Sequence, residues 1–177
     1  MSSSSKDRAN QLAFWQGSAG RSWTQLLETL DETFAPVSGS PMARSSIAIG
    51  ASVIDVGCSC GASSIELACV VGRDGEIVGI DVSPDMLERA RMRTPPDLPV
   101  TYLLANATVH AFPKDRADLL FSRFGAMFFS QPKAAFSNLK SGLKPGGRVL
   151  FSCWRDPREN PWLILPLPTN MSRGYRS

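Results

Sequence analysis

The chain has 177 residues, of which 43% are hydrophobic and 20% are charged, and its formal net charge is +3. This length and composition are typical of one globular domain with a buried core, and the small, scattered positive charge argues against a nucleic-acid-binding surface. No apolar run approaches the ~18 residues that a membrane span needs, and the Ser-rich N-terminus lacks the apolar core of a signal peptide, so we expect a cytoplasmic protein.

The N-terminal part of the chain is expected to be helical. Residues 1–9 are polar and are expected to be disordered, whereas apolar side chains recur at helical spacing from residue 9 to residue 34. Gly17 and Gly20 are expected to interrupt this helix. Residues 10–46 are therefore assigned to N-terminal helices followed by a loop rich in Ser, Pro and Gly. The apolar stripe comprises Trp15, Trp23, Leu26, Leu27, Leu30 and Phe34.

Strands and helices then alternate through residues 47–155. Short apolar runs predict five strands, at 53–56, 77–80, 100–105, 117–122 and 148–153. Helical spacing predicts helices between them, at 62–71, 83–92 and 131–143. Ser83 suits the N-cap of the second of these helices and Pro84 its first position. A tight turn is expected at 144–147, and an irregular tail at 156–177.

This alternation indicates the fold class. Short apolar strands separated by helices are typical of a parallel sheet whose two faces are both covered. We therefore predict an α/β domain with an open, doubly wound, Rossmann-like and mainly parallel sheet over residues 47–155.

The loop after the first strand carries the features of a ligand site. In open parallel sheets, ligands bind beyond the carboxyl ends of the strands. Gly57 and Gly61 lack a Cβ, so the backbone there turns sharply and approaches a ligand closely. Asp81 ends the next strand twenty residues after Gly61. That offset matches the acidic residue that accepts hydrogen bonds from ribose hydroxyls in nucleoside-binding folds.

Two other kinds of site fit the sequence less well. A dinucleotide fingerprint needs glycine where this loop has Ser59, so the match to G-x-G-x-x-G is poor. A zinc site needs paired C-x-x-C spacing, which the cysteines lack, so we expect no metal. The cysteines are Cys58, Cys60, Cys69 and Cys153.

The same loop also matches a hydrolase motif. The run from Gly57 to Gly61 reads G-x-S-x-G, which is the nucleophile elbow of α/β-hydrolases, with Ser59 as the nucleophile. The only histidine of the chain is His110, and at least two elements follow it, although the catalytic histidine of that fold lies late in the chain. No HGGG-type oxyanion loop is present. Hydrolysis at Ser59 therefore stays a remote alternative.

Longer runs of the sequence resemble one family. The run V-I-D-V-G-C-S-C-G-A-S-S-I-E-L-A, followed by V-G-I-D-V-S-P-D-M-L-E-R-A-R, resembles class I S-adenosylmethionine-dependent methyltransferases. Three later runs, L-A-N-A-T-V-H-A-F-P, D-L-L-F-S-R-F-G-A-M-F-F and L-K-P-G-G-R-V-L-F-S-C-W, and the early W-Q-G-S-A-G-R-S-W are similar to the ubiquinone/menaquinone-biosynthesis (methyltransferase type 11-like) members. The resemblance covers residues 10–162 and implies the strand order 3-2-1-4-5.

The resemblance also implies S-adenosyl-L-methionine as the cofactor and a set of residues that bind it. The methionine part would lie against the loop after the first strand, and Asp81 would accept hydrogen bonds from the ribose. Backbone groups at the end of the fourth strand would contact the amino end. The positions that correspond to the family's cofactor site are Asp55, Gly57, Cys58, Gly61, Asp81, Val82, Met86, Asn106, Ala107, Ser122 and Arg123.

The chain departs from the family at three places. Ser59 replaces the middle glycine of the loop, and Asn106 stands where an aspartate accepts from the adenine amine, so weaker cofactor binding is expected. The family's last two strands are not recognisable after residue 168. The chain therefore resembles a truncated member, and its fifth strand is expected to be an open edge through which copies could associate.

The resemblance implies methyl transfer to a small-molecule acceptor. His110 is the one side chain whose unperturbed pKa suits a general base, but an ordinary loop histidine is the favoured interpretation, so we assign no catalytic residue. The alternative function is a truncated, non-catalytic domain that binds the cofactor weakly or acts through a partner.

Overall fold

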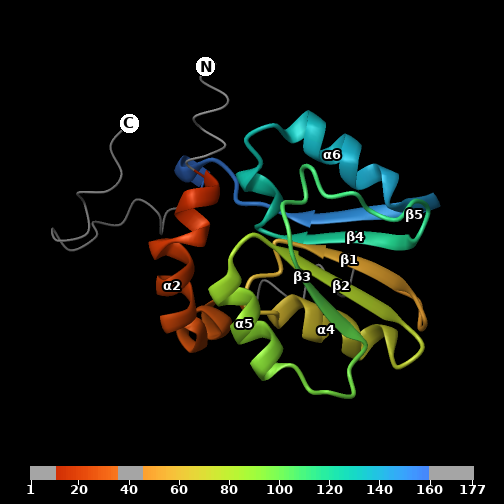
Figure 1. Cartoon of the computed structure of the whole chain (residues 1–177), viewed down its shortest axis with the longest axis horizontal. Coiled ribbons are helices and arrows are strands. Elements are labelled where there is room, and N and C mark those ends of the chain that lie inside the picture. Colours follow the sequence, from red (N-terminus) through yellow and green to blue (C-terminus); the bar gives the residue numbers. More distant parts are fainter. Residues whose placement is uncertain (1–10, 36–45, 160–177) are drawn as a thin grey trace, which may run out of the picture.

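The structure, a computed structural model, describes residues 11–35 and 46–159. The predicted disorder of residues 1–9, most of the loop at 36–46 and most of the tail at 156–177 lie outside these ranges. The described part contains one five-stranded sheet in the order β3-β2-β1-β4-β5, and all neighbouring strands are parallel (Figure 1). This confirms the predicted fold class and strand order. The strands are β1 (Ser52–Val56), β2 (Glu76–Asp81), β3 (Val100–Leu104), β4 (Ala117–Arg123) and β5 (Leu143–Ser152).

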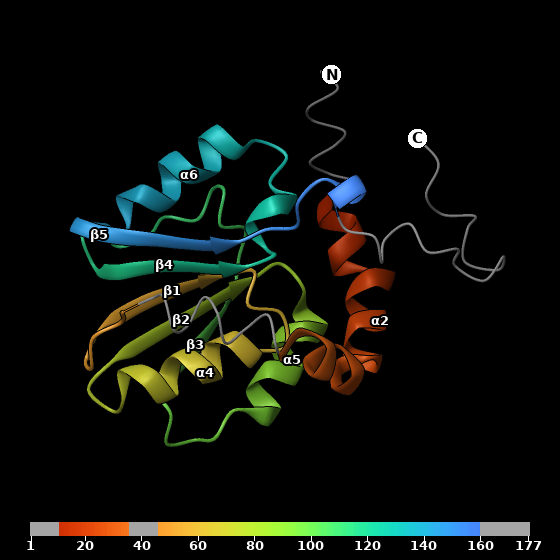
Figure 2. The same ribbon diagram turned by 180° about the vertical axis from the view of Figure 1, so that it is seen from behind.

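Helices cover both faces of the sheet. Figures 1 and 2 show α4 (Ala62–Val71) and α5 (Pro84–Arg93) on one side, and α6 (Pro132–Ser141) on the other. Successive residues of a strand point to opposite faces, so Val53 packs in the core beneath α4 while Ile54 packs beneath α6. Leu67 of α4 and Leu139 of α6 are fully buried in these two cores.

Helical residues 11–16, α2 (Ser18–Gln25) and residues 27–35 lie beyond the carboxyl ends of the strands (Figure 2). The expected interruption at Gly17 is present, and a second one falls at Leu26. The expected interruption at Gly20 is wrong, because Gly20 lies inside α2 and is buried there. A Cβ on Gly20 would stand 2.5 Å from Ser83 Oγ, so this glycine allows α2 to pack closely on the start of α5.

Most predicted element ends hold within two residues, and α5 has the predicted cap: Ser83 Oγ accepts the Met86 N–H, and Pro84 occupies the first turn. The expected turn at 144–147 is wrong as a boundary, because β5 begins at Leu143. Ala117 pairs with Leu143 and Leu119 with Arg148, so the extra residues form an irregularity within the strand.

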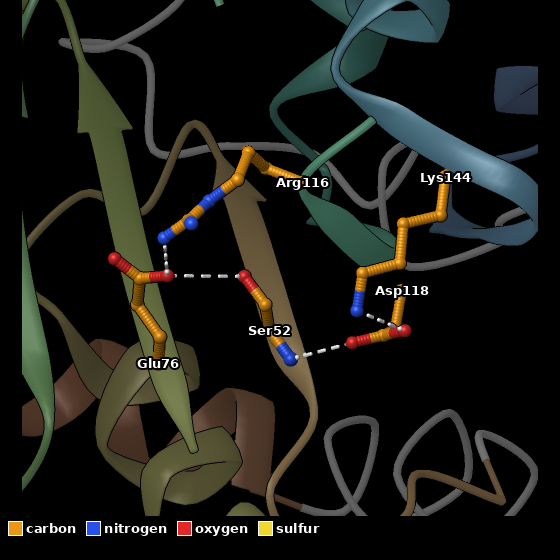
Figure 3. A network of polar contacts seen from close by, with 5 residues as sticks. All are labelled: Ser52, Glu76, Arg116, Asp118 and Lys144. Carbon is orange, nitrogen blue, oxygen red and sulfur yellow. Dashed lines mark hydrogen bonds and ion pairs between the residues drawn. The ribbon is translucent and has the colours of Figure 1, made fainter. Parts of the chain in front are cut away.

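Charged side chains join the amino ends of the strands, at the end of the sheet away from the N-terminal helices (Figure 3). Asp118 accepts the Ser52 N–H at 2.9 Å and pairs with Lys144 at 2.8 Å. Glu76 accepts from Ser52 Oγ and Arg116, both at 3.3 Å. The hydrogen bonds from Lys144 and from the Ser52 N–H lower the pKa of Asp118. This network joins the starts of β1, β2, β4 and β5, so we assign it to stability.

No helix within residues 11–35 and 46–159 is both long enough and apolar enough to cross a lipid bilayer.

Candidate functional site

A pocket of about 290 Å³ lies at the carboxyl ends of the strands, between the sheet and the N-terminal helices. Its wall draws on the loop after β1, the end of β2, the loop after β3 and the segment after β4. The members that the sequence singled out for cofactor binding and that line it are Gly57, Cys58, Asp81, Val82, Met86, Asn106, Ala107 and Arg123. The fold thus brings eight predicted residues from four separate segments to one cavity.

The floor of the pocket is made where two backbones touch. Gly57 has a φ of +71°, and a Cβ there would stand 2.7 Å from the Cα of Gly125. Gly125 lies in the segment after β4, and a Cβ on it would stand 2.6 Å from the Val56 carbonyl oxygen. Both glycines line the pocket. The absence of side chains at these positions therefore allows the loops after β1 and β4 to pack backbone against backbone at the pocket floor.

Ser59, at the middle of the loop, has a φ of +52°, a conformation that favours glycine. Its N–H donates to Asp81 Oδ2 at 2.9 Å, and its Oγ lies 3.3 Å from Met86 Sδ. The serine therefore keeps the backbone shape that a glycine would adopt, and its side chain points to the start of α5.

Asp81 lies where a nucleoside-binding carboxylate is expected. Its Oδ1 accepts the Ser83 N–H at 2.9 Å, while Oδ2 accepts the Ser59 N–H. Burial raises the pKa of Asp81, and the backbone N–H groups of Ser83, Ser59 and Val82 oppose that rise. A carboxylate has about four acceptor positions, so Asp81 retains capacity for hydroxyl donors while it ties the loop to β2.

Asp55 lies behind the pocket wall rather than in it. Its carboxylate is fully buried, and Oδ2 accepts the hydroxyls of Ser63 and Ser64, both at 2.7 Å, in the first turn of α4. Oδ1 has no hydrogen-bond partner within the described structure. Burial raises the pKa of Asp55 to about 6, against the lowering effect of the two serine hydroxyls and Arg123. Asp55 therefore joins β1 to α4, and the burial of its charge costs free energy.

Gly61 and Ser122 also lie outside the pocket wall, although both were expected to contact a cofactor. Gly61 has a φ of +84°, and the place of its missing Cβ is taken by the hydroxyl of Tyr102 from β3. Ser122 Oγ donates to the Val56 carbonyl at 2.6 Å and accepts the Ala126 N–H at 3.0 Å. The structure thus gives these two residues contacts that shape the loops around the pocket.

The residues that the resemblance assigned to the adenine also line the pocket. Val82, Met86, Asn106 and Ala107 form one stretch of wall beside Asp81. Asn106 Oδ1 already accepts the Thr108 N–H at 2.9 Å, so the side chain is oriented by its own loop. The oxygen has a second lone pair, which leaves an acceptor for an amine.

Two of the three charged side chains of the wall face opposite charges, and the third is Asp81. Arg123, whose side chain is 14% exposed, lies 3.7 Å from Glu66 of α4. Asp31, from the N-terminal helices, accepts from Arg93 of α5 at 2.7 Å. Burial raises the pKa of Glu66, and Arg123 opposes the rise.

The sequence did not identify the roof of the pocket. The N-terminal helices contribute Asp31 and three aromatic side chains to it, although their apolar stripe suggested a buried helix face only, and three phenylalanines of the segment after β4 also line the pocket. The signal was present in the number of aromatic residues at helical spacing, but spacing alone does not separate a core from a pocket roof. The aromatic lining residues are Trp15, Trp23, Phe34, Phe124, Phe128 and Phe129.

The hydrolase alternative finds no support in this geometry. The imidazole of His110, the one histidine of the chain, packs edge-to-face on Phe112 with ring centroids 4.8 Å apart and does not line the pocket. Ser59 Oγ is directed at Met86. Ser59 therefore has no histidine base, and His110 takes no part in the pocket.

The cysteines form neither disulfides nor a recognisable metal site within the described residues. All four cysteines are free, and Cys58 and Cys60 are buried beside the loop. Burial raises the pKa of the Cys60 thiol to about 11, so it stays protonated at neutral pH. Within residues 11–35 and 46–159, no three His, Cys, Asp or Glu side chains gather as metal ligands would.

Comparison with known proteins agrees with the fold and the loop. The methyltransferase domain family matches residues 53–147, which is more than half of the chain. A solved S-adenosylmethionine-dependent methyltransferase from Mesorhizobium loti is 27% identical, with a TM-score of 0.58 over 66% of this chain and 52% of that one. The chain therefore belongs to the class I S-adenosylmethionine-dependent methyltransferases.

Curated relatives are longer than this chain. The chain is 32% identical over 114 residues to 2-methyl-6-phytyl-1,4-hydroquinone methyltransferase of Synechocystis sp., covering 63% of this chain and 35% of that protein. It is 30% identical over 123 residues to aklanonic acid methyltransferase of Streptomyces sp., covering 68% and 56% respectively. The chain thus spans about a third to just over half of these relatives, and the narrower ubiquinone/menaquinone assignment stays a prediction.

Proposed function

We propose that the pocket binds S-adenosyl-L-methionine and that the protein transfers its methyl group to a small-molecule acceptor. One observation carries the proposal: the glycine loop after β1, the Asp81 carboxylate and the Asn106 loop converge on a single pocket with an aromatic roof. The residues present suit this cofactor, because Gly57 and Gly125 carry no side chains at the pocket floor and Asp81 keeps free acceptor positions. Family membership supports the same cofactor.

Each part of the wall has a task in this proposal. Gly57 and Cys58 would hold the methionine part against backbone, and Asp81 would accept from the ribose hydroxyls. Val82 and Met86 would pack on the adenine, while Asn106 and the Ala107 backbone would bond to its edge. Asp55, Gly61 and Ser122 would act from behind the wall by fixing the loops. These ten roles are proposals for positions that the fold brings together.

The chemistry asks little of protein side chains. When bound, S-adenosyl-L-methionine supplies a methyl group on a positively charged sulfur that leaves as a neutral thioether. The wall then has to orient the acceptor in line with that methyl group and keep water away. The apolar roof from the N-terminal helices suits this task. No side chain is assigned as a general base.

A small-molecule acceptor is proposed from the size and character of the pocket. Its volume of about 290 Å³ lies near the lower end of small-molecule sites. The two curated relatives compared above are both named for small organic acceptors. A macromolecular acceptor would need an open approach, whereas the N-terminal helices cover this pocket.

Calorimetry tests the cofactor directly. S-adenosyl-L-methionine and its demethylated product S-adenosylhomocysteine should both bind the purified chain, and NAD should not. Asp81→Ala should weaken binding by roughly 30-fold or more, because two hydroxyl hydrogen bonds to a charged acceptor are lost. Asp85→Ala, an adjacent acidic residue outside the pocket wall, is the matched control. Absence of heat and of a thermal shift with either cofactor form would contradict the proposal.

A second candidate is a non-catalytic cofactor-binding domain, the alternative function stated from the sequence. Cofactor binding without production of S-adenosylhomocysteine across a panel of acceptors would support that function over catalysis. Production of the thioether product in step with a methylated acceptor would exclude it.

We also propose self-association through β5. Within the described sheet β5 pairs with β4 alone, and its Val149 is 53% exposed. An open apolar strand edge is a template for pairing with another chain. Light scattering should show a dimer that Val149→Lys disrupts, whereas a monomer at high concentration would contradict this.

A further inference from the structure

Five aromatic side chains form a continuous series of ring contacts in the wall of the pocket. Phe128 contacts Trp15 with ring centroids 4.9 Å apart, Trp15 contacts Trp23 at 5.9 Å, and Trp23 stacks on Phe34 at 6.2 Å. Phe34 then contacts Phe124 at 5.5 Å. Phe124 and Phe128 both belong to the segment after β4, so the series begins and ends in that segment. All five side chains, here called the aromatic collar, line the pocket.

One member of the collar is held in an unfavourable backbone conformation. Phe124 has a φ of +66°, which is rare for a bulky residue and costs free energy. Two contacts with the end of β5 hold it there: its N–H donates to the Ser152 carbonyl at 2.9 Å, and its ring stacks on Trp154 at 4.3 Å with an interplanar angle of 4°. A phenylalanine can be buried without such strain. The strain therefore indicates that the direction of this ring is important for the pocket wall.

The charge around the collar is balanced. Of the three charged side chains that line the pocket, Asp31 and Arg123 each face an opposite charge, Arg93 and Glu66 respectively, and Asp81 lies on the wall proposed for the cofactor. A ligand that carries a net charge would have to compete with these pairs. The collar therefore favours a neutral molecule that presents flat faces to aromatic rings, since ring pairs gain stabilisation beyond the area they bury.

We propose that the collar is the acceptor subsite and that its ligand is a neutral, planar aromatic compound. This rests on the proposed function, because the cofactor would occupy the wall formed by Gly57, Asp81 and Asn106 and leave the collar to the acceptor. Phe34 is the position at which the N-terminal helices meet the ring of Phe124, so it links the two halves of the subsite.

Calorimetry with a matched pair of ligands tests the subsite. The chain is first saturated with S-adenosylhomocysteine and then titrated with 2-naphthol or with 2-decalol, which has the same carbon skeleton and hydroxyl group but no aromatic ring. We expect 2-naphthol to bind roughly tenfold more tightly. Phe34→Leu should reduce that preference about fivefold, and Phe34→Tyr should keep it. Phe14→Leu is the control, because Phe14 packs on Trp15 from outside the pocket wall and is half exposed.

Each result decides the matter. Equal affinity for the two alcohols, or an undiminished preference in Phe34→Leu with normal folding by circular dichroism, would overturn the aromatic subsite. Tighter binding of benzyltrimethylammonium than of 2-naphthol would show a cation-binding cage instead and overturn the neutral ligand. The first titration, with S-adenosylhomocysteine, tests the cofactor separately. If it shows no binding, the same pair is titrated into the protein alone, and the preference for 2-naphthol still tests the collar.

Discussion

The Cα of Gly125 lies 2.7 Å from the position that a Cβ on Gly57 would occupy, so the loops after β1 and β4 touch backbone to backbone. Gly57 and Gly125 are far apart in the sequence, and the parallel pairing of β1 with β4 brings them together. This contact lies at the pocket floor and couples the cofactor loop to the segment that carries Phe124 and Phe128.

Alanine at either glycine should destabilise the protein. Gly57→Ala adds a clash to a positive φ, and Gly125→Ala, at a φ of −71°, adds the clash alone. We expect a loss of about 3 kcal/mol or more for Gly57→Ala and about 2 kcal/mol for Gly125→Ala in urea denaturation. Gly146→Ala is the control, with a φ of +81° and nothing within 4 Å of its Cβ, and should cost about 1 kcal/mol. Equal losses at all three positions would contradict the close contact.

The buried carboxyl of Asp55 should make stability depend on pH. Its pKa is about 6 in the folded protein, above the ordinary value of 3.8, so between these values the folded state binds more protons than the unfolded state. The free energy of unfolding therefore falls as pH rises through this window, by about 3 kcal/mol in all. Asp55→Asn removes the ionisation, so the free-energy difference between variant and wild type should shift in favour of the variant from pH 4 to pH 7.5.

Urea denaturation at the two pH values measures this shift. The amide of the variant has the same burial at both pH values, so its own cost cancels from the comparison. Asp97→Asn, at an exposed carboxyl in the loop before β3, should leave the pH dependence of the wild type unchanged. A parallel pH profile for Asp55→Asn and wild type would show that the carboxyl does not titrate in this window.

The sequence predicted the strands and helices well because the sequence patterns that specify them are local. Apolar runs alternate with helical spacing, and Ser83 with Pro84 marks the start of α5. Asp81 was placed correctly at the end of β2 by its offset from the glycine loop. These features depend on a few neighbouring residues, so they are visible without the fold.

What the sequence did not give depends on contacts between distant segments. Gly61 leaves room for the Tyr102 hydroxyl, and Gly20 leaves room for the Ser83 side chain. Neither partner is identifiable from spacing. The burial of Asp55 behind the wall follows from how α4 packs on β1. The roof of the pocket depends on the N-terminal helices returning across the strand ends, which an apolar stripe alone does not specify.

Glycine at position 59 should improve both folding and cofactor binding. Ser59 has a φ of +52°, so Ser59→Gly relieves strain while it loses the contact of Oγ with Met86 Sδ. We expect a net stabilisation of about 0.5 kcal/mol and tighter binding of S-adenosylhomocysteine by roughly threefold. Ser46→Gly, at a φ of +44° and outside the pocket wall, is the control. Weaker binding in Ser59→Gly would mean that the serine hydroxyl helps to hold the ligand.

An aspartate at position 106 should strengthen binding in the same assay. Asn106 Oδ1 is engaged by the Thr108 N–H, and a carboxylate supplies a second oxygen for the adenine amine. Asn106→Asp should therefore raise the affinity for S-adenosylhomocysteine about threefold. Gln25→Glu, an exposed amide-to-carboxylate change outside the pocket wall, should not raise it. No gain at position 106 would indicate that the adenine amine is not bound there.

The ion pair between Asp31 and Arg93 should hold the N-terminal helices over the pocket. The two side chains are 29% and 30% exposed, and their nitrogen and oxygen lie 2.7 Å apart. A double-mutant cycle with Asp31→Asn and Arg93→Gln should give a coupling free energy of about 1 kcal/mol in urea denaturation. The pair Arg73–Asp97, at 3.7 Å with both side chains mostly exposed, should give a coupling near zero. Because the N-terminal helices form the roof, the single variants should also release S-adenosylhomocysteine faster in stopped-flow measurements. Equal couplings for the two pairs, with unchanged release, would show that other contacts hold the roof in place.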